Sequence, residues 1–381
     1  MLASLQDILD TVKSNTLTYQ QKLMCLGNIA ERLFDPRELL GYTDEEWQFL
    51  QNQMICDLNE GYAIYRPRYI LPDYNVYIKK GCEFLELPAP KDLDEALDGL
   101  LILYSHVPSI TTFPVYIGRL DMLLDPFITD EEQDYIKIKR FLNHVDKTVP
   151  DSFCHANIGP YDTKAGRLIL KAVIELEAPT PNMTIRYDKS KTSREFAELA
   201  AKACLLVSKP SFANDAYYIS DLGEQYGIAS CYNALPECGG AYTLTRLRLG
   251  TIARACKTVD EMVNELLPRV AKCALSTMDK RHKFVVEESN FFNTSFLEKE
   301  GFIKRTNFTG MFAIVGLADA ANHLLQQEGL NETFGKSQRG DEIATLIMDK
   351  LKEVTDNHEG VYAERTGNRY LLHAQVGASN H

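Results

Sequence analysis

Residues 226–236 read YGIASCYNALP, an apolar run that enters a small polar turn and leaves it toward a proline. We expect a strand over 226–232, because short apolar runs bounded by turn residues are typical of strands. The turn carries Cys231 at its tip, between Ser230 and Asn233, and a tip is where a working cysteine has to lie. The same residues also fit a buried structural thiol beside a turn, which is the commoner role of a cysteine.

Two further motifs precede this turn. The sequence PTPNMT at 179–184 is a rigid entry into a strand, and the dipeptide Asn214-Asp215 follows it. In this order and at about these separations, the three motifs resemble the central portion of pyruvate formate-lyase and its glycyl radical relatives. Over nearly the whole chain, the sequence resembles the YjjI family of glycyl-radical-type proteins. The resemblance also covers PVYIGRLD at 114–121, SFCHANIG at 152–159 and the stretch 307–316 that begins with NFTG.

The resemblance implies an α/β fold, namely a ten-stranded α/β barrel with a cysteine loop at its centre and a mainly helical N-terminal region. It implies that Cys231 forms a thiyl radical, abstracts a hydrogen atom from a substrate carbon and later returns it. The radical would be stored on a glycine of a C-terminal loop and installed by a radical-SAM activase with an iron–sulfur cluster. The resemblance further implies anaerobic metabolism, a small-molecule substrate and a homodimer, with no cofactor or metal bound directly.

Departures from the family's patterns narrow the expected chemistry. Ser230 stands where the formate-lyases carry a first cysteine, so acyl transfer to a second thiol is not expected. Asn233 stands where the eliminases and decarboxylases place a glutamate, and an amide can hydrogen-bond a substrate but cannot act as a base. The nearest carboxylate is that of Glu237, and the sequence assigns a role neither to it nor to Cys238.

A second departure lies near the C-terminus. The family's radical glycine stands in an Arg-Val-x-Gly-aromatic motif, whereas residues 365–368 read RTGN, with the arginine one residue too close and no aromatic after Gly367. We therefore expect the barrel to be incomplete at the C-terminus and the glycyl radical part to be absent. This chain alone is expected to be inactive.

Five residues are candidates for substrate binding: Ser230, Asn233, His155, Asn157 and Arg186. His155 and Asn157 belong to a compact polar cluster between two prolines, which fits a substrate site and a hydrogen-bonded loop equally well. Arg186 follows the Pro-Asn motif on a strand. If its side chain points into the barrel, it is a candidate clamp for an anion.

The hydrophobic pattern divides the chain at about residue 150. Residues 1–150 are expected to be the mainly helical N-terminal part of the barrel domain, and residues 151–381 the central portion that carries the cysteine loop. Thr-x-x-Gln/Glu capping boxes predict helix starts at Thr18, Thr43, Thr129, Thr192 and Thr258. Beyond residue 150 we expect strands at 183–187 and 311–315, and helices at 193–207, 258–282, 317–327 and 341–354.

Composition limits the remaining possibilities. The 381 residues carry a net charge of −12, which argues against nucleic acid as a partner. The nine cysteines are scattered, with no C-x-x-C pair, so neither a disulfide framework nor a four-thiolate metal site is expected. The sequence shows no signal peptide and no apolar run long enough for a membrane helix, so we expect a cytoplasmic protein.

Three alternative functions stay open at this point. The chain could be a non-catalytic barrel or scaffold subunit, which the missing glycine motif favours. It could be an ordinary thiol enzyme with Cys231 as nucleophile and His155 as base, provided that the two side chains lie within hydrogen-bond reach. A formate acetyltransferase-like or anaerobic ribonucleotide reductase-like activity is the weaker alternative.

Overall fold

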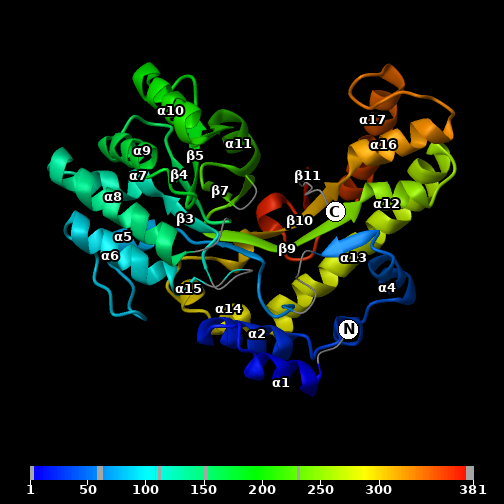
Figure 1. Cartoon of the computed structure of the whole chain (residues 1–381), viewed down its shortest axis with the longest axis horizontal. Helices are drawn as coiled ribbons and strands as arrows, with labels where there is room; N and C mark the ends of the chain where they lie inside the picture. The colour runs from blue at the N-terminus through cyan, green and yellow to red at the C-terminus, as the bar shows by residue number, and fades with distance from the viewer. Residues whose placement is uncertain are drawn as a thin grey trace.

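The computed structural model describes residues 4–57, 63–107, 109, 113–149, 153–229 and 232–374. The chain is organised around two sheets that lie side by side, each with its own cover of helices (Figure 1). A two-stranded hairpin contacts both of these sheets. This arrangement places the hairpin where the inward faces of the two sheets meet.

The first sheet is fully parallel. Its strands, in spatial order, are β3 (Tyr116–Arg119), β4 (His155–Ile158), β5 (Asn182–Tyr187) and β6 (Ser211–Asn214). Parallel neighbours need long crossovers, and the helices that supply them are α8 (Glu131–Thr148), α9 (Lys164–Leu176) and α10 (Arg194–Val207). All four residues of β4 are buried, as expected for a strand that is covered on both faces.

The second sheet combines three parallel strands with two short antiparallel ones. The parallel strands are β9 (Gly239–Arg248), β10 (Phe308–Val315) and β11 (Leu371–Ala374), and β1 (Ile55–Asp57) and β2 (Tyr69–Leu71) pair antiparallel with β9. Its outer helices are α12 (Leu249–Arg254), α13 (Leu267–Lys283), α16 (Leu317–Gln327) and α17 (Gln338–Asp356). Figure 1 shows these helices on the side of the sheet away from the first one.

Alternate side chains of the second sheet face different partners, because strand side chains point to opposite faces. The outward set packs with the helices and includes Leu247, Phe312 and Ile314. The inward set belongs to the same hydrophobic cluster as the hairpin residue Ala229 and includes Leu244, Met311 and Ala313. The inward face of this sheet is therefore continuous with the core around the hairpin.

The hairpin consists of β7 (Tyr226–Ala229) and β8 (Asn233–Pro236), which pair antiparallel. It continues almost directly into β9. The glycine at 240 has a φ of 146°, and a Cβ atom there would lie 2.0 Å from the carbonyl oxygen of Tyr69. Only glycine allows β2 to approach β9 this closely, so the Gly-Gly pair after the hairpin is needed to bring the two strands together.

The other α-helices lie mainly in the first half of the chain. They are α1 (Leu5–Lys13), α2 (Tyr19–Glu31), α3 (Pro36–Leu40), α4 (Asp44–Gln51), α5 (Asn75–Lys80), α6 (Leu93–Tyr104), α7 (Leu120–Leu124), α11 (Asp215–Leu222), α14 (Phe291–Thr294) and α15 (Phe296–Lys299). Among the described residues, no helix has the length and apolar character needed to cross a bilayer.

Several predicted element boundaries are confirmed and others are wrong. The capping boxes at Thr18 and Thr43 form as expected. The caps predicted at Thr129 and Thr192 are wrong by one residue, because the side chains of Asp130 and Ser193 bind the first free backbone N–H groups instead.

The helix predicted over 258–282 is divided in two. A π-helical segment, Glu261–Leu266, precedes α13, and Pro268 lies in the first turn of α13, where its missing N–H is not required. The domain boundary at residue 150 remains a prediction. The structure adds that β1, β2 and β3, all from residues 1–150, pair with strands from the second part.

Candidate active site

The tip of the hairpin is the centre of the candidate site. Ser230 and Cys231 lie outside the described residues, but their neighbours Ala229 and Asn233 pair across the hairpin. Tyr232 has a φ of 64°, a left-handed conformation that turns the chain sharply. Its ring meets the ring of buried His155 edge-on, with centroids 5.0 Å apart. The tip therefore lies against the start of β4.

Asn157 of β4 holds the hairpin through its side-chain amide. Its Nδ2 donates to the carbonyl oxygen of Ile228 at 2.9 Å, and its Oδ1 accepts from the Ile228 N–H at 2.7 Å. Asn157 is fully buried. Because β7 has no second strand partner among the described residues, the amide replaces the backbone pairing that a neighbouring strand would provide. The contact lies two residues before Ser230.

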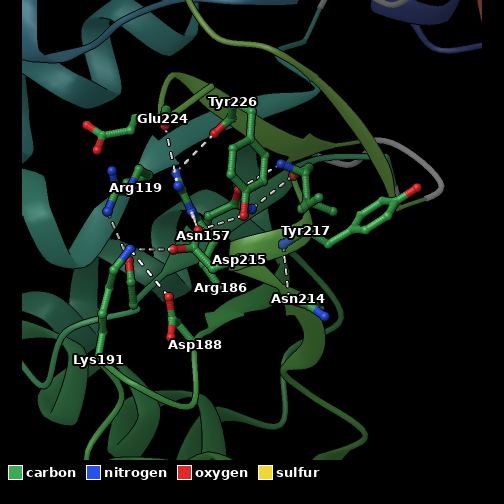
Figure 2. A network of polar contacts seen from close by, with 12 residues as sticks. Arg119, Asn157, Arg186, Asp188, Lys191, Asn214, Asp215, Tyr217, Glu224 and Tyr226 are labelled. Carbon is green, nitrogen blue, oxygen red and sulfur yellow. Dashed lines mark hydrogen bonds and ion pairs between the residues drawn. The ribbon is translucent and has the colours of Figure 1, made fainter. Parts of the chain in front are cut away.

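Arg186 of β5 holds the base of the hairpin (Figure 2). Its Nε donates to Asp215 Oδ1 at 2.8 Å, and its terminal nitrogens donate to the carbonyl oxygens of Tyr226 and Glu224. The guanidinium also lies over the Tyr226 ring, 3.9 Å from the centroid, while the Tyr226 hydroxyl donates to Asp215. The side chain points inward, as the anion-clamp hypothesis required, and the anion that it binds here is Asp215.

Asp215 stays ionised in this buried network. Burial raises the pKa of its carboxyl, but the hydrogen bond and charge of Arg186 outweigh that effect, so the pKa lies below its usual value. Lys191 adds a second cation at 3.5 Å from Asp215 and 3.4 Å from Asp188 (Figure 2). The ion pairs of Asp215 with Arg186 and Lys191 join β5, the start of α11 and the loop before α10 into one rigid support.

A buried carboxyl group follows the hairpin directly. Glu237 is 7% exposed and accepts a hydrogen bond from the Tyr116 hydroxyl at 3.1 Å. Burial and the neighbouring charge of Asp73 raise the pKa of Glu237 to about 7, against the weaker opposing influence of Arg119 and Arg186. Glu237 can therefore hold or release a proton near neutral pH.

Asp121, from the PVYIGRLD segment, supports the adjoining turn. It is fully buried and accepts from the N–H groups of Gly159 and Met122 at 2.7 Å and 2.8 Å. Burial raises the pKa of Asp121 to about 6. Its carboxyl connects the end of β3 to the turn that follows β4, the strand that carries His155 and Asn157.

Asn233 has a side-chain donor that no described residue accepts. The residue is 9% exposed, and its buried Nδ2 has no hydrogen-bond acceptor among the residues that the structure describes. A buried amide left unpaired costs about 1–3 kcal/mol, which a bound polar group would relieve. Asn233 is thus a predicted substrate-binding residue whose side chain has a donor that the described residues do not use.

The structure brings part of the predicted set together. His155 meets the tip through Tyr232, Asn157 binds β7, and Arg186 lies at the opposite end of the hairpin. The sequence analysis missed Tyr116 and Tyr226, which are ordinary aromatic strand residues with no local signal of their roles. It quoted Asp215 only as part of a motif. Across the described residues, no group of three or more His, Cys, Asp or Glu side chains is arranged to hold a metal ion.

Comparison of the sequence with known proteins gives one family and close relatives. A family model described as "Glycyl radical enzyme YjjI-like" matches residues 17–381. A protein of Haemophilus influenzae is 92% identical over 381 residues, which is 100% of this chain and 74% of that protein. The protein YjjI of Escherichia coli is 42% identical over 372 residues, covering 97% of this chain and 71% of that protein.

Comparison of the structure identifies the fold. The anaerobic ribonucleotide reductase of Thermotoga maritima, solved with citrate in its active site, superimposes with a TM-score of 0.74 and 11% identity, covering 98% of this chain and 79% of that one. The hydroxyproline dehydratase of Clostridioides difficile gives 0.62 and 11%, covering 98% and 70%. At these identities the likeness concerns the fold alone, and it confirms the predicted α/β barrel of the glycyl radical type.

Proposed function

Because this chain belongs to the YjjI-like family of glycyl radical enzymes, we propose that Cys231 is the residue that reacts with the substrate. In this proposal the Cys231 thiyl radical takes a hydrogen atom from a substrate carbon, which leaves a thiol and a carbon-centred radical. After the substrate radical has rearranged or fragmented, the thiol returns a hydrogen atom to the product radical and the thiyl is regenerated. Atoms and electrons balance without an external oxidant.

The observation that carries the proposal is the way in which the hairpin is held. Hydrogen-atom transfer needs donor and acceptor nearly in contact, so a small displacement of the sulfur would lower the rate strongly. The backbone that leads to residue 230 is fixed by the two hydrogen bonds of Asn157, and the base is fixed by Arg186. Such support is what a reactive residue on a turn requires.

The remaining site residues divide into two roles in this proposal. Asn233 and His155 are proposed to contact the substrate, since they flank or face the tip, and Ser230 is proposed to do so because it precedes Cys231 in the sequence. Asn157 and Arg186 are proposed to act as positioning residues, because their polar groups bind the hairpin itself. The Nδ2 of Asn233, which has no acceptor in the described part of the chain, is the strongest support for a substrate contact within this set.

The source of the radical completes the proposal. The family's glycyl radical, installed by an activase that uses S-adenosylmethionine and an iron–sulfur cluster, supplies the unpaired electron that reaches Cys231. We propose a small-molecule substrate, an anaerobic cytoplasmic setting and a homodimer on the same family grounds.

Deuterium exchange into the activated full-length protein tests the role of Cys231 without knowledge of the substrate. A thiol exchanges its proton with solvent, so in D2O a glycyl radical that trades hydrogen with Cys231 acquires deuterium at its α-carbon. We expect the electron paramagnetic resonance doublet of the wild-type protein to collapse in D2O. The Cys231→Ala variant should keep its radical and its doublet.

Cys238→Ala is the matched control, because Cys238 is a buried thiol on the same hairpin-to-strand connection. It should exchange as the wild type does. A doublet that collapses equally in Cys231→Ala would assign the hydrogen transfer to another group and reject the proposal. A radical that fails to exchange even in the wild type would reject it as well.

A further inference from the structure

A buried guanidinium on the second sheet has no counter-ion among the residues that the structure describes. Arg246 is 3% exposed and lies near the end of β9. Within the described part of the chain it pairs with no carboxylate, its Nε has no acceptor, and its Nη2 has only the Cys56 sulfur at 3.4 Å. A thiol sulfur is a weak acceptor. An uncompensated buried charge costs several kcal/mol, so this cation requires an explanation.

Arg186 shows what a satisfied buried arginine looks like in the same molecule. Its guanidinium has an aspartate, two carbonyl oxygens and an aromatic face. Arg246 has none of these partners among the described residues. The difference shows that Arg246 has hydrogen-bonding capacity that the described residues do not use.

The strand register gives the surroundings of Arg246. Cys56 of β1 and Ala313 of β10 are its direct neighbours across the sheet, and His373 of β11 pairs in turn with Ala313. Neighbouring strands lie about 4.8 Å apart, so the backbones at Arg246 and His373, which are two strands apart in this row, lie roughly 10 Å from each other. Ala313, the residue between them in this row, offers no polar group to the guanidinium.

This row lies on the inward face of the second sheet. Ala313 belongs to the same hydrophobic cluster as Leu244, two residues before Arg246, and as Ala229, the residue before Ser230. The neighbouring Leu247 belongs instead to the cluster under the outer helices. Arg246 is therefore on the side of β9 that faces the hairpin, not on the side that faces α13.

We propose that Arg246 binds an oxyanion, the carboxylate or phosphate group of the substrate whose C–H bond Cys231 attacks. A guanidinium is a rigid planar fork that binds either group through two parallel hydrogen bonds, and a buried setting strengthens both. The inference rests on the proposed function for the identity of the ligand as substrate. The binding site itself rests on the buried guanidinium of Arg246, which no carboxylate among the described residues neutralises.

Calorimetric titration of the unactivated chain tests the site. Sodium phosphate and sodium acetate are titrated separately at constant ionic strength into the wild type, Arg246→Gln, Arg246→Lys and Arg254→Gln. Arg254 is an exposed arginine on α12 and serves as the matched control. We expect saturable binding of at least one anion to the wild type and to Arg254→Gln, and at least tenfold weaker binding to Arg246→Gln.

Arg246→Lys keeps the positive charge but loses the planar set of donors of the guanidinium. It also tests the inference if the Arg246→Gln variant does not fold. We expect it to weaken acetate binding more than phosphate binding, because a point charge serves a phosphate better than a planar carboxylate. Tighter binding of phosphate by the wild type would indicate a phosphorylated substrate, and tighter binding of acetate a carboxylic acid. Equal isotherms for the wild type and the two Arg246 variants would overturn the inference.

The two proposals fail separately. Cys231→Ala should bind the anion as the wild type does, because no radical takes part in binding. If the wild type binds no anion but its radical exchanges deuterium as expected, the role of Arg246 is rejected and that of Cys231 stands. If the wild type binds the anion but its radical does not exchange deuterium, the role of Cys231 is rejected and the anion site at Arg246 stands.

Discussion

The inward faces of the two sheets differ in what their polar side chains do. On the first sheet, Asn157 and Arg186 use nearly all their hydrogen-bonding groups on the hairpin and on Asp215. On the second sheet, the inward face is lined by leucine, methionine and alanine, with Arg246 as a buried cation that has no acidic partner among the described residues. The inward face of the first sheet thus holds the hairpin. The inward face of the second sheet carries a guanidinium, that of Arg246, whose hydrogen-bonding capacity the described residues do not use.

The second sheet places its own polar network on the opposite side. Thr243 Oγ1 lies 3.0 Å from His282 Nε2 of α13, and His282 Nδ1 lies 2.9 Å from the Tyr370 hydroxyl. Burial lowers the pKa of His282 to about 4, so the ring is neutral at pH 7. This network joins sheet to helix and leaves the inward face apolar. Under the two proposals, the two sheets have separate roles: the first sheet positions Cys231, and the second sheet binds the substrate.

Removing the arginine of the first sheet should have the largest effect on stability. Arg186→Met leaves Asp215 as a buried charge without its main partner, and breaking a buried pair this way costs about 3–5 kcal/mol. Urea unfolding at pH 7 measures the loss. The double variant Arg186→Met, Asp215→Leu should recover part of it, because it removes the stranded charge. The structure indicates that the two residues are coupled. If the loss of unfolding free energy in the double variant equals the sum of the losses in the two single variants, they are not coupled.

The amide of Asn157 should come next. Asn157→Ala leaves the N–H and carbonyl groups of Ile228 buried without partners, and we expect a loss of about 3 kcal/mol in unfolding free energy. Asn293→Ala, on an exposed amide, is the control and should stay within about 0.5 kcal/mol of the wild type. A loss as small as that of the control would show that the first sheet does not hold the hairpin through this residue.

Glu237 allows a pH test of the same face. A carboxyl whose pKa is raised in the folded state binds its proton more tightly there, so it stabilises the fold at low pH and that contribution is lost as pH rises. With a pKa of about 7 when folded, Glu237 should cost about 2 kcal/mol of stability between pH 5 and pH 7.

Glu237→Gln should remove this loss. The variant keeps an acceptor for Tyr116 and cannot ionise, so it should match the wild type at pH 5 and exceed it in stability at pH 8. Asp73, Arg119 and Arg186 carry charges near Glu237, and the difference between the two proteins cancels most of their contribution. If the unfolding free energies of the two proteins change equally with pH, the charged form of Glu237 is better solvated than its burial indicates.

The smallest effect is expected on the outer side of the second sheet. Thr243→Val keeps the shape of the side chain but removes the hydroxyl that meets His282, and the cost should be about 1 kcal/mol. Anion binding by Arg246 should be unchanged, because the two side chains lie on opposite faces of β9. If anion binding falls together with stability, the two faces of β9 are not independent and the separate roles of the two sheets are rejected.

Local pattern was sufficient for most of the elements. The helix over 317–327 begins and ends where it was predicted, and the strand at 183–187 was placed to within one residue, because apolar periodicity and turn residues act over a few positions. Cap positions were harder. Thr129 and Asp130, or Thr192 and Ser193, are adjacent residues that can each cap a helix, and only the packed structure selects between them.

The sequence by itself determined the family and the α/β barrel, since ordered motifs at fixed separations carry that information. It also named His155, Asn157 and Arg186, although not what they bind. Only the tertiary structure decided that Arg186 meets Asp215 while Arg246 meets no carboxylate among the described residues. Both arginines follow short apolar runs and look alike in sequence. Their difference depends on which distant residues the folded chain brings within hydrogen-bond distance, and that is a property of the packing of whole strands.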